Sequence, residues 1–214
     1  MKKEPHNLES LISELSDQPP MVKRVFKPAA LVLPWLIIVA AYLAGVIQFL
    51  GLRMDIDTVF YQPLFQFELA LLGTIALTAS YCAASLSIPD MGGRRWILAI
   101  PAMLLAVFVG LMGWYFTGED FHMPVHAWHH CFSAALLMCF VPIAVLLLLV
   151  RKGNTTRPYM MAAMTLLSVS ALAWGGMRLS CASGDIGHIF FFHFMPLIIL
   201  AIIISALARR LYRW

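Results

Sequence analysis

The stretch AALVLPWLIIVAAYLAGVIQFLG, residues 29–51, contains no charged residue. A helix needs roughly 20 apolar residues to cross the hydrocarbon core of a bilayer. The stretch is too long for the apolar region of a signal peptide, and no small-residue cleavage site follows it. We therefore expect residues 29–51 to stay in the protein as a membrane-spanning helix.

The composition of the whole chain extends this expectation. Of its 214 residues, 61% are hydrophobic and 12% are charged, whereas soluble domains are about half apolar and a quarter charged. Apolar runs long enough to span a bilayer lie near residues 29–51, 64–88, 96–116, 128–150, 159–177 and 189–208. We predict an all-α membrane protein, with a six-transmembrane-helix bundle over residues 29–214 and a polar tail over residues 1–28.

Lysine and arginine are distributed unevenly between the two sides of this predicted bundle. Thirteen of the 15 Lys and Arg residues fall in the tail, the second and fourth loops and the C-terminus, and only Arg53 and Arg178 fall on the other side. Cytoplasmic loops of membrane proteins have the excess of Lys and Arg. We therefore predict a multi-pass protein of the bacterial inner membrane with both termini in the cytoplasm. The net charge of +4 reflects this asymmetry, so we expect no direct nucleic-acid binding.

The polar tail contains a short amphipathic pattern. Apolar residues recur in it at the spacing of one helix face, and a second apolar set follows: Leu8, Leu11, Ile12 and Leu15, then Val22, Val25 and Phe26. A lone helix of this length is marginal in water, so it needs a surface to lie against. Its polar residues include acidic side chains, which anionic lipid repels. This favours the hydrophobic groove of a partner protein over the membrane surface.

Cysteine and histidine gather where the third loop enters the fourth predicted span. Residues 121–131, FHMPVHAWHHC, end in Cys131, and Cys181 lies in the loop RLSCASGDIGH on the same side of the membrane. In a bacterium with two membranes this side is oxidising. Two thiols there could form a disulfide or bind a thiophilic metal. A permanent structural disulfide and two unrelated thiols are the alternatives.

The same side of the membrane offers further ligands for a metal ion. His126 and His130 are spaced i, i+4 on one face of a helix, while Asp185, His188 and His193 lie around the start of the sixth span. Histidine and thiolate together can hold zinc or a related metal. Histidines also occur at membrane edges simply as interfacial polar residues, so the pattern does not firmly imply a cofactor.

Glu68 lies one to two turns inside the second predicted span. An ionisable residue at this depth is costly unless it is paired. Its expected partner is Arg178 or a histidine at the same membrane face, in a structural ion pair that fixes helix packing. Arg53, with Asp55 and Asp57, is expected to form a solvated loop.

Common enzyme motifs are absent from the chain. It has no phosphate-binding loop, no nucleophile elbow and no HExxH motif, so we predict no enzymatic activity and no catalytic residues. Two other classes stay open. One is a small b-type cytochrome or oxidoreductase with haem between His130 and His193. The other is a metal-ion transporter that uses the outer-face histidines, although the spans offer few polar residues for a transport path.

Taken together, these elements resemble the NrsF-type polytopic membrane anti-sigma factors. The segments that resemble the family are LISELSDQPPMVKRVFKPAAL (11–31), PLFQFELALL (63–72), HHCFSAALLMCFVP (129–142), SCASGD (180–185) and ALARRLYRW (206–214). The resemblance implies a regulator that holds an extracytoplasmic-function sigma factor at the membrane, away from RNA polymerase. The tail would then bind the sigma factor, and Cys131 and Cys181 would sense oxidant or metal stress outside.

Overall fold

The computed structural model describes residues 12–13, 16, 27–88, 96–117, 128–150 and 155–211. Within these residues all regular secondary structure is helical. Six helical segments are long and apolar enough to cross a membrane. The predicted all-α bundle of six spans is therefore confirmed, and the spans differ from the predicted ranges only at their ends.

The spans follow one another along the chain with short connections. They are α2 (Pro28–Leu50), α4 (Pro63–Leu86), α5 (Trp96–Phe116), α6 (Trp128–Val150), α7 (Pro158–Ser180), and a last span in which the π-helical turn η2 (Ile189–Phe194) continues into α9 (Met195–Leu211). Proline occupies the start of α2, α4 and α7. It is favoured there because its missing N–H is one that a helix start leaves unpaired in any case.

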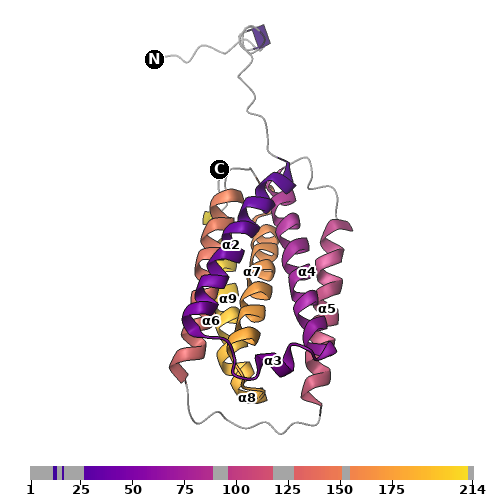
Figure 1. Ribbon diagram of the computed structural model, residues 1–214. Helices are drawn as coiled ribbons and strands as arrows, with labels where there is room; N and C mark the ends of the chain where they lie inside the picture. Colours follow the sequence, from indigo (N-terminus) through magenta and orange to yellow (C-terminus); the bar gives the residue numbers. More distant parts are fainter. Residues whose placement is uncertain are drawn as a thin grey trace.

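Two short helices mark one end of the bundle. They are α3 (Ile56–Val59) and α8 (Ile186–His188), and Figure 1 shows both at the end opposite to the start of α2 and the end of α9. We call this the α3/α8 end. The first span begins and the last span ends at the opposite end of the bundle, because an even number of spans returns the chain to the side on which it started.

Helix α7 lies inside the bundle, in contact with α4, α6 and α9 (Figure 1). Within the apolar windows of α4 and α7, 61% of the residues are buried, against 11% in α5. Helix α5 packs mainly on α4 and exposes the rest of its surface. The α4–α7 pair is therefore the core of the bundle, and α5 is a peripheral helix whose apolar side chains face outward.

Small side chains let the central helices approach one another closely. Ala76 and Ser80 lie one turn apart on α4 and are at most 1% exposed. On the α7 side, the Ser168 hydroxyl donates a hydrogen bond to the Ala76 carbonyl at 2.8 Å. A Cβ atom added at Gly176 of α7 would lie only 2.6 Å from Sδ of Met138 in α6. Small residues at helix interfaces are the usual means of close packing in lipid.

Two aromatic side chains fasten α2 to α6. The Trp35 indole N–H, fully buried, donates to the Pro142 carbonyl at 3.0 Å. The Tyr42 hydroxyl donates to the Leu137 carbonyl at 2.7 Å. Both bonds hold α2 against the segment of α6 around Pro142, where the proline interrupts the hydrogen-bond ladder of the helix.

Candidate functional site

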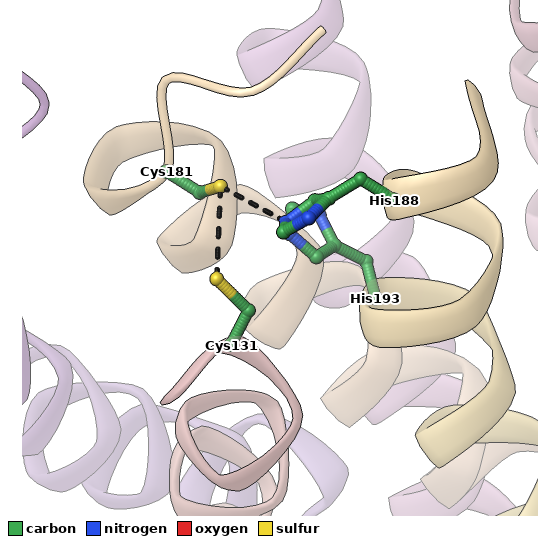
Figure 2. A group of neighbouring side chains, drawn as sticks. All are labelled: Cys131, Cys181, His188 and His193. Atoms are coloured by element: carbon green, nitrogen blue, oxygen red, sulfur yellow. Dashed lines mark hydrogen bonds between the residues drawn. The ribbon is translucent and has the colours of Figure 1, made fainter. Parts of the chain in front are cut away.

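Cys131 and Cys181 meet at the α3/α8 end. Cys131 lies in the first turn of α6, and Cys181 directly follows α7. The two cysteines are 50 positions apart in the chain. The Cys131 thiol donates to Cys181 Sγ, with the two sulfur atoms 3.8 Å apart (Figure 2). Both cysteines are free and only partly buried. The structure thus brings together the two thiols that the sequence places on one side of the membrane.

His188 is the next member of the site. Its Nε2 atom lies 3.4 Å from Cys181 Sγ (Figure 2). The Asp185 carboxylate accepts the backbone N–H of His188 at 2.9 Å, and the Asp185 carbonyl accepts that of Ile189 at 3.0 Å. These two bonds start the helical turn that holds His188 against Cys181. The His188 side chain is consequently buried, with 7% of the residue exposed.

His193 completes the group from the π-helical turn η2. Its imidazole points towards the cysteines beside that of His188, with the ring centroids 5.3 Å apart (Figure 2). One ligand atom from each of Cys131, Cys181, His188 and His193 lies within 4.8 Å of all the others. His193 is 2% exposed, and neither ring nitrogen has a hydrogen-bond partner in the structure. We call these four residues the Cys/His group.

The surroundings of Cys181 favour its thiolate form. The hydrogen bond from Cys131, followed by that with His188, lowers the pKa of the Cys181 thiol below its usual range. Hydrogen bonds to a charged form stabilise that form. The thiolate is both the nucleophile and the metal ligand of cysteine chemistry, so the contact with His188 favours the form of Cys181 that reacts and binds metals.

A buried ion pair lies next to the Cys/His group. Glu68 of α4 is fully buried, and its carboxylate accepts hydrogen bonds from Arg178 Nε at 3.2 Å and from Trp174 Nε1 at 3.1 Å. Of the two partners expected for Glu68, the structure pairs it with Arg178. The Trp174 ring also lies edge-on to His193, at 6.1 Å between centroids. Trp174 therefore links the ion pair to the Cys/His group.

A cavity of about 170 Å³ opens beside this ion pair, lined by Glu68, Met112, Tyr115, Trp174, Arg178, Gly184 and Ile189. A cavity of this size with polar groups in its wall can hold a few water molecules. The Arg178 side chain is 16% exposed. The cavity is therefore large enough to admit water to the charged pair at the end of the bundle.

The expectation that Arg53 belongs to a solvated loop is wrong. The Arg53 residue is 8% exposed, and it forms an ion pair with Asp55 at 2.7 Å. Its guanidinium also donates to the Arg178 carbonyl at the end of α7 and lies 5.9 Å from the centroid of the Phe65 ring. The hydrogen bond from Arg53 lowers the pKa of the Asp55 carboxyl. A cation is stabilised here both by the aromatic face and by the negative end of the α7 dipole.

The structure separates the other ligand candidates from the Cys/His group. His130 is exposed on α6 and is not one of the four residues, and the Asp185 carboxylate is used by the backbone of His188. His126 lies outside the described residues. Of the apolar tail residues, Ile12 is described, whereas Leu8, Leu11, Leu15, Val22, Val25 and Phe26 lie outside the described residues.

From the sequence, His193 is one of several possible metal ligands around the two cysteines, and nothing there singles it out. It is five residues from His188, and in an α-helix residues five apart point about 140° away from each other. The π-helical turn between them removes that divergence. The run of aromatic residues in IFFFHF gives no local sign of a π-turn, so the grouping emerged only from the structure.

A comparison with models of protein families identifies a match over nearly the whole chain. The family model of NrsF, described as negative regulator of sigma F, matches residues 15–214. The chain belongs to the NrsF family. Membership makes the protein a negative regulator of a sigma factor, so its partner is a sigma factor. The family is not a known enzyme family. Searches of curated proteins and of solved structures gave no match.

The NrsF match spans all six membrane helices and the whole Cys/His group. It begins at Leu15, so Leu8, Leu11 and Ile12 of the apolar tail pattern precede it. The site at the α3/α8 end is therefore part of the segment that matches the family, whereas residues 1–14 of the tail are not.

The Glu68–Arg178 pair should be energetically coupled. Glu68→Gln leaves the Arg178 guanidinium without its carboxylate. We expect the free energy of unfolding to fall by about 2–4 kcal/mol, because breaking a fully buried pair costs roughly 3–5 kcal/mol and the Arg178 side chain is partly exposed. Adding Arg178→Met should recover part of this loss. Denaturant unfolding in detergent micelles measures Glu68→Gln, Arg178→Met and the double variant, and strictly additive single effects would show that the two charges are not coupled.

Proposed function

We propose that this protein holds an extracytoplasmic-function sigma factor at the bacterial inner membrane through its N-terminal tail, and that Cys131 and Cys181 sense oxidant or metal stress on the opposite side. The observation that supports the proposal best is the NrsF match over residues 15–214. A membrane-bound negative regulator of a sigma factor has to contact its partner in the cytoplasm, where RNA polymerase is found. The proposal therefore needs a cytoplasmic binding segment and a means of reporting conditions outside.

The orientation follows from charge. Thirteen of the 15 Lys and Arg residues belong to segments that flank the start of α2 and the end of α9 or connect the spans at that end. The positive-inside rule makes that end cytoplasmic and the α3/α8 end external. The Cys/His group then faces the periplasm, and the tail lies in the cytoplasm.

Reporter fusions test this orientation. A phosphatase that is active only after export should be active when fused after Thr117, at the external end of α5. It should be inactive when fused after Trp214. Comparable expression of the two fusions is verified by immunoblot. An active fusion at Trp214 together with an inactive one at Thr117 would invert the topology and remove the proposed roles of both the tail and the cysteines.

The tail has the chemistry of a partner-binding segment. The Ile12 residue is 56% exposed. The Ser16 hydroxyl donates to the Ile12 carbonyl at 2.7 Å, a bond between residues four apart that is typical of a helical turn. An apolar side chain left exposed on a helix is what a hydrophobic groove in a partner recognises. Together with Leu8, Leu11 and Leu15, and with Val22, Val25 and Phe26 beyond them, Ile12 would form the sigma-binding surface.

Substitutions on opposite faces of the tail helix test the binding surface. Leu11→Glu with Ile12→Glu should lower the amount of sigma factor recovered with the full chain by at least about tenfold, because losing a central apolar contact typically costs ~2 kcal/mol or more. Ser10→Glu with Ser13→Glu adds the same charge to the opposite face and should change recovery little. Affinity capture from native membranes, read by mass spectrometry, gives the measurement.

The same capture experiment tests the proposal as a whole. A chain lacking residues 1–20 should retain no sigma factor. Equal recovery by the two tail variants would show that the contact lies elsewhere. If the full chain itself captured no sigma factor, the proposal of direct sequestration would fail.

The two cysteines provide the sensor of the proposal. Oxidation would join their sulfur atoms, and the two electrons and two protons released would pass to an oxidant such as hydrogen peroxide, which is reduced to water. The sulfur atoms would then have to move from 3.8 Å to about 2.05 Å. This would draw the start of α6 towards the end of α7. Such a change alters sigma binding only if its free energy differs between the tail-bound and tail-free states.

Cysteine substitutions separate sensing from binding. Cys131→Ser and Cys181→Ser should each abolish induction of sigma-dependent transcription by peroxide or by a thiophilic metal, while sigma capture stays as in the wild type. Cys139→Ala, a buried cysteine in the same helix as Cys131, is the matched control and should leave induction unchanged. A reporter gene read before and after stress measures the response. Unchanged induction in both serine variants would eliminate the sensor role.

A further inference from the structure

We propose that Cys131, Cys181, His188 and His193 form a closed four-ligand site for Zn²⁺ or a similar thiophilic divalent ion, and that the π-helical turn η2 completes it. The inference deepens the proposed function, because its role in regulation rests on the same cysteines acting as the sensor. The ligand set of the site, two sulfur and two nitrogen atoms, is one that zinc takes in structural sites.

The spacing of the ligand atoms fits a tetrahedral ion. With Zn–S near 2.3 Å and Zn–N near 2.0 Å, a regular tetrahedron places two sulfur atoms about 3.8 Å apart and sulfur and nitrogen about 3.5 Å apart. The structure has 3.8 Å between Cys131 Sγ and Cys181 Sγ, and 3.4 Å between Cys181 Sγ and His188 Nε2. All four candidate ligand atoms lie within 4.8 Å of one another. Small side-chain rotations would bring His193 to bonding distance.

The π-helical turn places the second histidine. His188 and His193 are five residues apart, and an α-helix would separate their directions by about 140°. In η2 the hydrogen bonds run from residue i to i+5, as the bond from the Met195 N–H to the Phe190 carbonyl shows. This wider turn stacks residues five apart on the same face. Figure 2 accordingly shows both imidazoles directed at the two sulfur atoms. Isolated π-turns within α-helices occur often at functional sites.

The burial of His193 points to a missing partner. At 2% exposure, both of its ring nitrogens lack a hydrogen-bond partner. A buried polar group without a partner is costly and rare in proteins. A bound metal ion would take one nitrogen as a ligand, and so would remove part of that penalty. A role in packing alone would be served as well by phenylalanine, which occupies most of the neighbouring positions in IFFFHF.

The charge of the ligand set selects a divalent ion. Two thiolates and two neutral imidazoles sum to −2, so a divalent ion makes the complex neutral, which suits a site at the edge of a bilayer. Sulfur and imidazole ligands favour zinc and related soft ions over Ca²⁺ and Mg²⁺, which prefer oxygen. Of the described carboxylates near the group, that of Asp185 accepts a backbone N–H and that of Glu68 pairs with Arg178. A hard cation would therefore find no oxygen ligand within the group.

Metal binding would tie three elements together at the α3/α8 end. Cys131 belongs to the start of α6, Cys181 to the end of α7, and the two histidines to the start of the last span. With four protein ligands the site has no open position, as in structural rather than catalytic zinc sites. The same sulfur atoms cannot ligate the ion and form a disulfide at once. Oxidation would therefore expel the ion, and the bound ion would protect the thiols.

Cobalt substitution tests the site on the full chain. The protein is purified in detergent under reducing conditions, stripped of metal and titrated with Co²⁺, whose spectrum reports tetrahedral sulfur ligation. We expect one Co²⁺ per chain, with thiolate-to-cobalt charge-transfer absorption and intense visible bands that added Zn²⁺ abolishes. Cys131→Ser, Cys181→Ser and His188→Ala should each weaken binding by more than the roughly 10- to 100-fold that loss of a ligand's supporting partner costs.

His193→Phe distinguishes a ligand from a packing residue. The variant keeps a flat ring and removes both unpaired nitrogens, so its fold should be as stable as the metal-free wild type. Zn²⁺ should raise the melting temperature of the wild type and of His130→Ala, the matched control, but not that of His193→Phe. Metal binding by His193→Phe equal to that of the wild type, or an absence of Co²⁺ binding by the reduced wild type, would overturn the proposal.

The metal experiment is independent of sigma binding. A wild-type chain that captures a sigma factor but binds no metal would refute the site and leave the proposed sequestration standing. A chain that binds metal but captures no sigma factor would refute the proposed sequestration and leave the metal site standing. Removal of residues 1–20 should leave Co²⁺ binding unchanged, because none of the four ligands lies in the tail.

Discussion

The Glu68–Arg178 ion pair is the interaction on which the α3/α8 end of the molecule depends. A carboxylate at 0% exposure inside a membrane-spanning helix needs compensation, and the structure supplies it with the guanidinium of Arg178 and the indole of Trp174. These contacts lock α4 to α7, the two most buried helices. Trp174 in turn packs against His193. The position of the Cys/His group is thus set by the same helix pair that neutralises the buried charge.

The bundle is polar at one end and apolar in its middle. Between the ion pair and the opposite end, α4 and α7 pack through small side chains such as Ala76 and Ser168, which also share an interhelical hydrogen bond. Closely packed interfaces of this kind have few alternative arrangements. A shift of α6 against α7 at the Cys/His group would consequently be passed along the helices as a rigid displacement. Helix α2, which continues from the tail, contacts α6 through Trp35, and so would receive it.

Two chemical states of the proposed sensor follow from its four ligands. Bound metal would hold α6, α7 and the last span at the spacing seen in the structure, whereas a disulfide would draw Cys131 and Cys181 together and release the two histidines. The two states differ in which elements are linked. To alter sigma binding, this difference has to favour one state of the tail by a few kcal/mol. The NrsF family assignment identifies the partner class, and the Cys/His group identifies where such an input could act.

The amino-acid sequence by itself determined the class of fold and much of its plan. Uninterrupted apolar runs require helices, because a bilayer offers no hydrogen-bond partners to an open backbone. Glu68 lies inside a membrane-spanning segment, where a carboxylate is costly unless it is paired, so a charged partner was expected. The two cysteines were placed on one side by counting spans. Segments spread over the whole length were enough to indicate the NrsF family.

Only the tertiary structure decided which side chains meet. Arg178 rather than a histidine pairs with Glu68, Arg53 is buried against Phe65 instead of solvated, and His193 replaces His130 beside the cysteines. Helical periodicity predicts the face of the helix on which a residue lies. It does not predict which helix packs against that face, or where an α-helix changes to a π-helical turn. A single π-helical turn rotated His193 onto the cysteines, because inserting one residue into a turn redirects every side chain that follows.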